Sequence, residues 1–199
     1  ESFPAKVPVV QYVAPTRADA VEYQNEQRAV QLAVDALWSK RREHQSMFAV
    51  QRELARLRLR SSQPTDNRGD LSGKGETLIG LLLDLVAEGR RILVFSHFKE
   101  TVRALMELCQ ELGVRAQAYL GEQKDRARAL MAFREGQADV LLLTPLGKAG
   151  LDIPEADTVV INDVWVDPSV VDQMMDRAHR LGSKHKVVTC YQLVANGTI

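Results

Sequence analysis

Apolar and polar positions follow two different rhythms along the chain. From about residue 75 onward, short and nearly continuous apolar runs alternate with amphipathic stretches of helical period. Such continuous runs are typical of parallel strands that are covered on both faces. The pattern predicts strands at 91–96, 115–120, 139–143, 158–161 and 187–193, and helices at 78–87, 98–112, 124–133 and 168–181. We therefore predict an α/β fold in which helices cover both faces of a parallel sheet.

The first part of the chain has a different composition. Residues 16–63 contain no glycine or proline and are rich in strong helix formers. They predict two helices, at about 16–38 and 44–60, which follow a short strand at 7–13. We expect a helical protrusion over residues 15–60 and a flexible linker over residues 61–75, because the linker segment is rich in turn-forming residues. The α/β domain would then occupy residues 76–199.

Charge and cysteine content exclude several classes of protein. The 26 basic and 26 acidic residues balance, so binding to a polyanion must rely on local patches. No apolar run is long enough to cross a membrane, and no signal-peptide pattern opens the chain. Cys109 and Cys190 lack metal-ligand spacing and predict buried free thiols in a reducing compartment. We expect no metal site, and the start at Glu1 without methionine indicates a piece of a longer protein.

In open parallel sheets, ligands bind beyond the carboxyl ends of the strands. The loops that follow Ser96, Leu120, Leu143 and Ile161 are therefore the places where we expect function. A Walker A phosphate loop is not among them. The nearest match, residues 69–75, has the wrong glycine spacing and a glycine where a hydroxyl should follow the lysine. No Asp-Glu-x-His motif follows a strand, so this chain lacks the parts that hold ATP and magnesium.

The last predicted helix carries a polar stripe. Gln173, Arg177 and Arg180 share one helix face, because residues three or four apart are neighbours. Arginine stays charged near neutral pH and holds anions through a planar fork. Two guanidiniums on one face are well suited to gripping phosphate. The alternative is a surface helix whose arginines pair with Asp172 and Asp176.

Several short motifs occur in a fixed order, and together they carry a resemblance. Over residues 75–199 the sequence closely resembles the C-terminal RecA-like lobe of the Swi/Snf-type helicase-like ATPases, in helicase superfamily two. Residues 3–60 resemble it more loosely. The motifs lie at 92–98, 144–153, 156–160, 165–168, 176–182 and 191–199.

The resemblance implies a RecA-like fold and a division of labour between two lobes. Residues 1–14 would be a strand and link from a first motor lobe, which carries the Walker motifs and holds most of the ATP and Mg²⁺. The activity implied is that of an ATP-dependent translocase or chromatin-remodeller-like motor on double-stranded DNA. Arg177 and Arg180 would act as arginine fingers toward the γ-phosphate, assisted by Gln173.

The resemblance also implies nucleotide and DNA contacts. Asp152 would accept a hydrogen bond from the ATP ribose, although a turn or capping carboxylate is the alternative. Thr144 would contact DNA, and the alternative is that it only caps the end of its strand. The implied nucleotide-binding residues are Asp152, Gly150 and Gly147, and the implied DNA contacts are Ser96, His97, Lys99, Gly121, Thr144 and Lys148.

Two positions depart from the family pattern. Glu122 follows Gly121 at a position where the family has Ser or Thr. Pro145 stands where the family has a basic residue, and Lys148 would supply the missing positive charge. The arginines at 52, 56 and 60 on the second predicted helix form either a solvated face or a secondary phosphate contact.

Two other functions remain open, namely a strand-separating DNA or RNA helicase and a non-catalytic RecA-like binding module. The composition favours a cytoplasmic bacterial or archaeal protein, with a nuclear location if it is eukaryotic.

Overall fold

Strands and helices alternate along most of the chain. A computed structural model describes residues 3–39, 43–145, 151–163, 168–179 and 185–197. The elements are β1 (Ala5–Val13), α1 (Arg17–Ser39), α2 (Glu43–Ser62), α3 (Gly73–Ala87), β2 (Ile92–Phe95), α4 (Lys99–Glu111), β3 (Ala116–Tyr119), α5 (Gln123–Arg134), β4 (Val140–Leu143), β5 (Thr158–Ile161), α6 (Pro168–Ala178) and β6 (Val187–Ala195).

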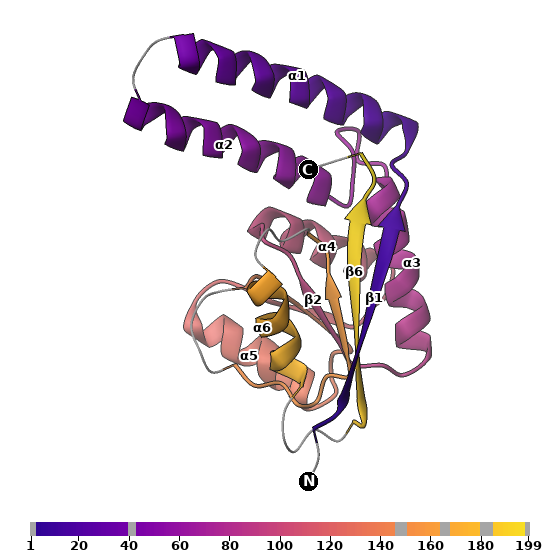
Figure 1. The fold of residues 1–199 in the computed structure, drawn as a ribbon. Helices are drawn as coiled ribbons and strands as arrows, with labels where there is room; N and C mark the ends of the chain where they lie inside the picture. Colours follow the sequence, from indigo (N-terminus) through magenta and orange to yellow (C-terminus); the bar gives the residue numbers. More distant parts are fainter. Residues whose placement is uncertain (1–2, 40–42, 146–150, 164–167, 180–184, 198–199) are drawn as a thin grey trace.

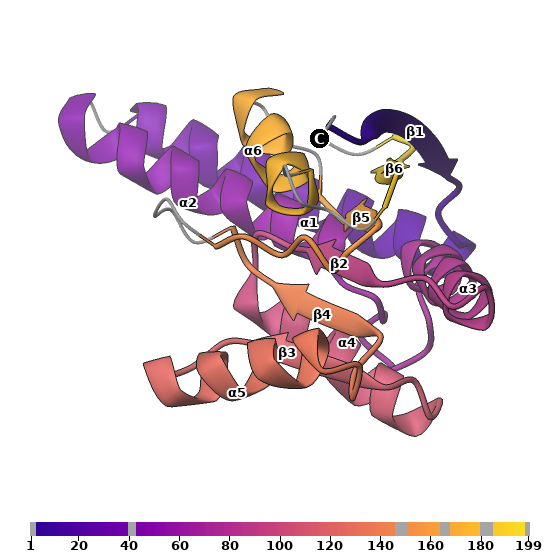
Figure 2. The same cartoon turned by 90° about the horizontal axis from the view of Figure 1, so that it is seen from below.

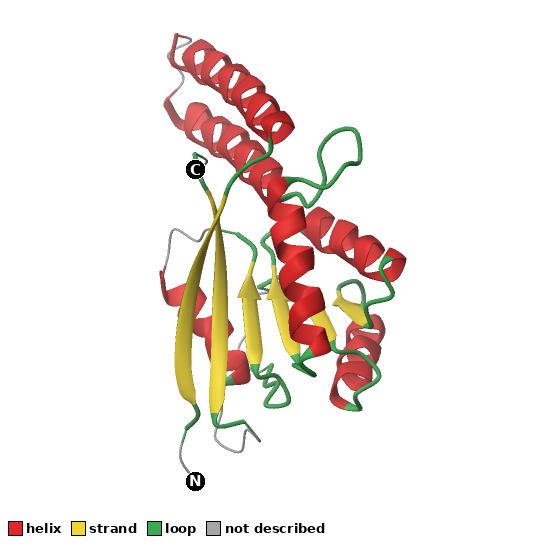
Figure 3. Cartoon of the chain, turned by 90° about the vertical axis from the view of Figure 1, so that its right-hand side faces the viewer, coloured by secondary structure: helices red, strands yellow, loops and turns green. Residues whose placement is uncertain are grey.

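The strands form a single sheet of six, in the order β1-β6-β5-β2-β4-β3, and every described pair is parallel. This confirms the predicted parallel α/β fold. Helices α3 and α4 pack on one face around Leu82 and Leu105, and α5 and α6 pack on the other around Phe133 and Met174. Figure 3 shows the helices on both sides of the strands, and Figure 2 places β1 and β3 at opposite ends of the sheet. Strands β2, β4 and β5 are buried along their whole length, which explains their continuous apolar runs.

The first strand belongs to this sheet. We predicted that residues 1–14 come from another lobe, but β1 pairs with β6 along nine residues, from Ala5 opposite Val187 to Val13 opposite Ala195. The assignment to a separate lobe is therefore corrected for this structure. The physical reason is that β1 supplies backbone partners for the outer edge of β6 and buries Val13 in the core.

Helices α1 and α2 form the predicted protrusion, which extends past the edge at which the arrows of β1 and β6 end (Figure 1). We call this the carboxyl edge of the sheet, and the opposite one the amino edge. A small apolar cluster of Tyr23, Val30 and Leu57 holds the two helices together. The predicted helix bounds agree closely with the structure, since the run of strong helix formers contains no helix breaker.

The three arginines that we expect on one face of α2 are engaged in ion pairs. Their pairings are Arg52 with Glu53, Arg56 with Glu26 and Glu53, and Arg60 with Glu22. Arg56 Nη2 lies 2.7 Å from Glu26 Oε1, which joins α2 to α1. Because these guanidiniums already have carboxylate partners, the structure favours the solvated-face interpretation over a phosphate contact.

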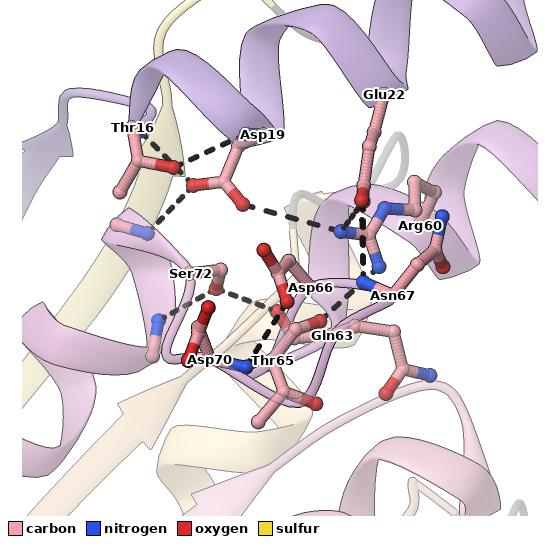
Figure 4. A network of polar contacts seen from close by, with 12 residues as sticks. Thr16, Asp19, Glu22, Arg60, Gln63, Thr65, Asp66, Asn67, Asp70 and Ser72 are labelled. Atoms are coloured by element: carbon pink, nitrogen blue, oxygen red, sulfur yellow. Dashed lines mark hydrogen bonds and ion pairs between the residues drawn. The ribbon is translucent and has the colours of Figure 1, made fainter.

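The segment between α2 and α3 is folded tightly, whereas we predicted a flexible linker. Asp66 Oδ1 accepts two backbone N–H groups, which closes a turn. Ser72 donates its hydroxyl to Gln63 O at 2.9 Å and caps α3 by accepting the Gly75 N–H at 3.0 Å. Its backbone N–H donates to Pro64 O, also at 2.9 Å. Figure 4 shows this network beneath α1. The turn-forming residues therefore fix the segment instead of loosening it.

Candidate functional site

Helix α6 runs from one edge of the sheet to the other and carries two of the predicted phosphate-gripping residues, Gln173 and Arg177. It begins after β5 at the carboxyl edge and ends near the start of β1. His179, just past its end, has Nε2 2.7 Å from Pro4 O, and its ring stacks on Phe3 with 5.2 Å between centroids. Arg177, in the last turn, therefore lies at the amino edge of the sheet.

This position corrects one expectation. We expect function in the loops beyond the carboxyl ends of the strands, but the structure separates the candidates that it describes into two groups at opposite edges. The reason is topological, because a helix that connects two parallel strands must run back to the edge at which the second strand begins.

The amino-edge group joins Arg177 to the loop that contains Asp152. Arg177 Nη1 donates to Leu151 O at 3.4 Å, and Arg177 O accepts the Ile153 N–H at 2.8 Å. Asp152 stands between these contacts with an exposed side chain, and Arg134 Nη2 donates to its carbonyl at 2.8 Å. Arg177 and Asp152 thus lie close to one another, and their roles toward nucleotide stay predictions.

Gln173 is exposed on α6, one helical turn before Arg177. The other predicted nucleotide residues, Arg180, Gly147 and Gly150, lie outside the described residues and stay predictions. The same holds for Lys148.

The carboxyl-edge group begins with the turn after β2. Ser96 is 0% exposed, and its hydroxyl donates to Asp163 Oδ2 at 2.9 Å. The backbone N–H of His97 donates to the same oxygen. Ser96 therefore does not present its hydroxyl to a phosphate in this structure, whereas the side chains of His97 and Lys99 are exposed. We interpret Ser96 as a residue that fixes the turn.

Thr144 follows β4 at the same edge. It is 7% exposed, and its Oγ1 is buried without a hydrogen-bond partner among the residues that the structure describes. A buried unpaired hydroxyl costs about 1–3 kcal/mol, so such a group usually has a partner in the working state. The strand-end cap is not formed within the described residues, and the DNA-contact prediction for Thr144 stays open.

Gly121 begins the turn between β3 and α5 with φ +81°, a conformation that side chains rarely adopt. The neighbouring Glu122, which we expected to repel phosphate, has its carboxylate 3.7 Å from Lys124 Nζ. Both side chains are largely exposed, so this pair only moderates the local charge.

Sequence reasoning missed one pair of buried charges. Lys74, in the first turn of α3, is 6% exposed, and Asp163, after β5, is 7% exposed. Burial lowers the pKa of Lys74 to about 8, while attraction to Asp163 opposes this change. Burial also raises the pKa of Asp163, and Lys74 is the strongest influence that lowers it again. The signal in the sequence was the Gly-Lys-Gly at 73–75, because the glycines let α3 start against neighbouring backbone and enclose the lysine.

A cavity of about 230 Å³ lies at the base of the protrusion. It is enclosed by α1, α2, the start of α3 and the ends of β1 and β6. Lys74, Arg60, Tyr23 and Asn196 are among the residues that line it.

Metal-binding and membrane-spanning features are absent from the described part of the chain. Within it, no three His, Cys, Asp or Glu side chains are grouped as a metal site would need. No helix in the same residues is both long and apolar enough to cross a bilayer.

A six-stranded parallel sheet of this order, covered by helices on both faces, defines a RecA-like α/β domain. A family model described as the helicase conserved C-terminal domain matches residues 73–182, and the chain belongs to that family. Its relatives place it among the C-terminal lobes of Swi/Snf-type helicase-like ATPases.

Two relatives illustrate this similarity. The chromatin-remodelling ATPase INO80 of Drosophila melanogaster is 34% identical over 179 residues, which cover 82% of this chain and 11% of that protein. An uncharacterised ATP-dependent helicase of Mycoplasma pneumoniae is 28% identical over 160 residues, which cover 77% of this chain and 15% of that protein. The chain thus spans less than a sixth of either relative.

Solved structures show the same fold. The C-terminal part of the Fun30 ATPase domain superposes with a TM-score of 0.78 at 18% identity, over 99% of this chain and 87% of that one. The Sulfolobus solfataricus SWI2/SNF2 ATPase core in complex with dsDNA gives a TM-score of 0.79 at 21% identity, over 98% of this chain and 42% of that one.

Proposed function

We propose that this chain is the second motor lobe of an ATP-dependent translocase or remodeller that acts on double-stranded DNA. The observation that carries the proposal is the amino-edge surface, where Arg177 and Asp152 lie together in a chain without a Walker A motif. Such a surface is half of a nucleotide site. The relatives support this assignment, because one is named a chromatin-remodelling ATPase and one solved core is described with dsDNA.

The residues present fit one side of an ATP molecule. Arg177 would place positive charge near the γ-phosphate, Asp152 would accept a hydrogen bond from the ribose, and Gln173 would help to orient the attacking water or the arginine. An arginine finger of this kind accelerates hydrolysis by a factor of about 10³–10⁵. Arg180, Gly147 and Gly150 would complete this side.

Bound ATP would supply the phosphoanhydride bond that is hydrolysed. As the family resemblance implies, Mg²⁺ would be held mainly by the first lobe of the same protein.

DNA would contact the carboxyl edge. The exposed side chains of His97 and Lys99 and the turn at Gly121 lie there, together with the buried Thr144 hydroxyl, which has no hydrogen-bond partner among the described residues. Lys148 would add charge. Contacts of this kind go to phosphates, so affinity should fall steeply as salt concentration rises.

The proposal is tested in the full-length protein. Arg177→Ala should abolish DNA-stimulated ATP hydrolysis while leaving DNA affinity within about twofold, and we expect the same for Arg180→Ala. Arg128→Ala is the matched control, because Arg128 is exposed on α5 and pairs only with Asp125 among the described residues. The isolated chain should hydrolyse no ATP. Hydrolysis by the isolated chain, or full activity of Arg177→Ala, would refute the split site.

A second assay separates the two motor activities. A translocase should displace the third strand of a DNA triplex without unwinding a duplex, whereas a strand-separating helicase should release a strand from the duplex. Duplex unwinding at a rate similar to triplex displacement would favour the helicase alternative.

A further inference from the structure

The cavity at the base of the protrusion is lined by a buried lysine whose ammonium group is unpaired. The cavity measures about 230 Å³, and Lys74 is among the residues that line it. Lys74 is 6% exposed, and no hydrogen bond or ion pair joins it to any residue that the structure describes. Asp163 attracts it electrostatically but forms no ion pair with it. A buried ammonium without an acceptor is strongly unfavourable, so such a group usually has an acceptor in the working state.

The backbone around Lys74 keeps this side chain inside the protein. Gly73 and Gly75 flank it in the first turn of α3, and both glycines lie against other backbone. A Cβ atom on Gly73 would be 2.3 Å from Ala14 O, and one on Gly75 would be 1.9 Å from Pro64 O. Since the first turn of α3 is wedged between these two segments, it cannot rotate to bring the lysine to the surface.

The carboxylate among the described residues of the lining already has other partners. Asp19 Oδ2 accepts the backbone N–H groups of Thr16 and Gly73 at 3.0 and 2.7 Å. Its Oδ1 lies 4.0 Å from Arg60 Nη2, and Figure 4 shows the two side chains turned toward each other. Asp19 and Arg60 therefore offset one another, and Lys74 leaves one net positive charge in the described lining.

The uncharged part of the lining indicates what kind of anion fits. Val13, Pro15 and Ala20 supply apolar surface, and the amide of Asn196 supplies hydrogen-bonding groups. Water takes up about 30 Å³ per molecule in the liquid, so the cavity has room for a group several times that size. A singly charged carboxylate on a short aliphatic chain matches both the charge and the walls. Phosphate matches them less well, because its second charge would be uncompensated and it has no apolar part.

We propose that this cavity binds a carboxylate on a short aliphatic chain, which Lys74 holds through a charge-assisted hydrogen bond. A small organic acid or an acidic side chain from another part of the full-length protein can supply this group. The bound carboxylate would tie together α1, the start of α3 and the end of β6, which meet at the cavity. The site lies at the edge of the sheet opposite Arg177 and needs neither nucleotide nor DNA.

The first test titrates the chain with butyrate at pH 7, where Lys74 is charged because its pKa is about 8. The readout is the chemical shift of backbone amide signals in NMR spectra. Butyramide is the matched control ligand, because it has the same shape without the charge. We expect saturable shifts at Gly73, Gly75 and Asn196, with a Kd in the millimolar range, and binding at least about tenfold weaker for butyramide and for inorganic phosphate. No saturable shift, or binding of either control as tight as that of butyrate, would overturn the proposal.

Two variants show whether the ligand enters this cavity. Lys74→Met keeps the length of the side chain and removes its charge, so the affinity for butyrate should fall at least about tenfold. Ala20→Leu keeps the charge and fills the cavity from α1, so it should also block binding, and it gives an answer even if Lys74→Met disturbs folding. Lys186→Met is the control and should bind butyrate within about twofold of wild type, because Lys186 is exposed beside the amino end of β6. Unchanged affinity in Lys74→Met or in Ala20→Leu would contradict the assignment.

The full-length protein distinguishes the two sources of the carboxylate. If a small acid is the ligand, butyrate should raise the midpoint of thermal unfolding of the full-length protein as it does that of the chain. If an acidic side chain of the protein occupies the cavity, butyrate should leave this midpoint unchanged. Lys74→Met should then lower the midpoint by at least about 3 °C more in the full-length protein than in the chain. A full-length protein that shows neither response would refute the carboxylate site.

Discussion

The tightly folded connector makes Gly75→Ala the sharpest test of the structure. Gly75 lies in the first turn of α3, where a Cβ atom would be 1.9 Å from Pro64 O and 2.8 Å from Pro64 C. Carbon and oxygen cannot approach so closely, and both clashing atoms belong to backbone. The Pro64 carbonyl must therefore move by more than about 1 Å, an order-of-magnitude figure from ordinary contact distances.

The size of the effect follows from what this movement breaks. Pro64 O accepts the Ser72 N–H at 2.9 Å, and losing that hydrogen bond costs about 1 kcal/mol. Forcing an extra methyl group into a packed site adds about 1–3 kcal/mol. We expect a loss of about 3 kcal/mol in the free energy of unfolding. For a chain of this length the midpoint of thermal unfolding should fall by roughly 6–12 °C.

The assay is thermal or urea unfolding of the chain, followed by circular dichroism, with Gly80→Ala as the control. Gly80 lies in the same helix and has open space around the position of a Cβ atom. Its replacement should stabilise the chain by about 0.5–1 kcal/mol, because alanine is the better helix former. If both variants behave alike, the connector does not pack against α3 as described.

Three further predictions concern stability and thiol chemistry. Arg60→Met should lower the free energy of unfolding by about 1–2 kcal/mol, because Arg60 is mostly buried and joins α2 to Glu22 on α1. Arg58 is exposed, so Arg58→Met should change the free energy of unfolding by less than about 0.5 kcal/mol. Urea titrations of both variants measure the difference, and equal effects would contradict it. Ser72→Ala should cost about 1 kcal/mol through loss of the α3 cap, and an unchanged urea midpoint would speak against that cap. Burial raises the pKa of both cysteine thiols to about 11, so the unfolded chain loses these protons at lower pH than the folded chain does. The thiols should therefore make the free energy of unfolding fall as pH rises from 9 to 11. A thiol reagent at pH 8 should label the chain only in denaturant, and rapid labelling of the native chain would contradict the burial of the thiols.

The central sheet could be predicted well from the sequence. Strands β2, β4 and β5 were recognised because both of their faces are buried, which leaves an uninterrupted apolar signal. The pairing of β1 with β6 could not be predicted in this way. It depends on contacts between the two ends of the chain, and several side chains of β1 are exposed, so its pattern does not reveal a partner.

The site was predictable in its residue types but not in its arrangement. The positive charge of Arg177 and the exposed Asp152 follow from motifs, and the structure brings them together. The burial of Ser96 and of its hydrogen-bond partner Asp163 depends on how distant segments of the chain meet. The composition of residues 61–75 indicated turns correctly, yet whether a turn is loose or fixed depends on acceptors such as Asp66 and Ser72.

The pairing of β1 with β6 also dictates an order of events during synthesis. β1 leaves the ribosome before every other described element, but its only described strand partner is the last strand to be made. Until β6 emerges, β1 has an open edge on both sides, with Val7, Val10 and Tyr12 exposed to solvent even in the finished fold. Contacts of such long sequence separation form slowly. The nascent chain therefore carries an unpaired strand from the synthesis of β1 until that of β6, and joining the two is the step that completes the described sheet.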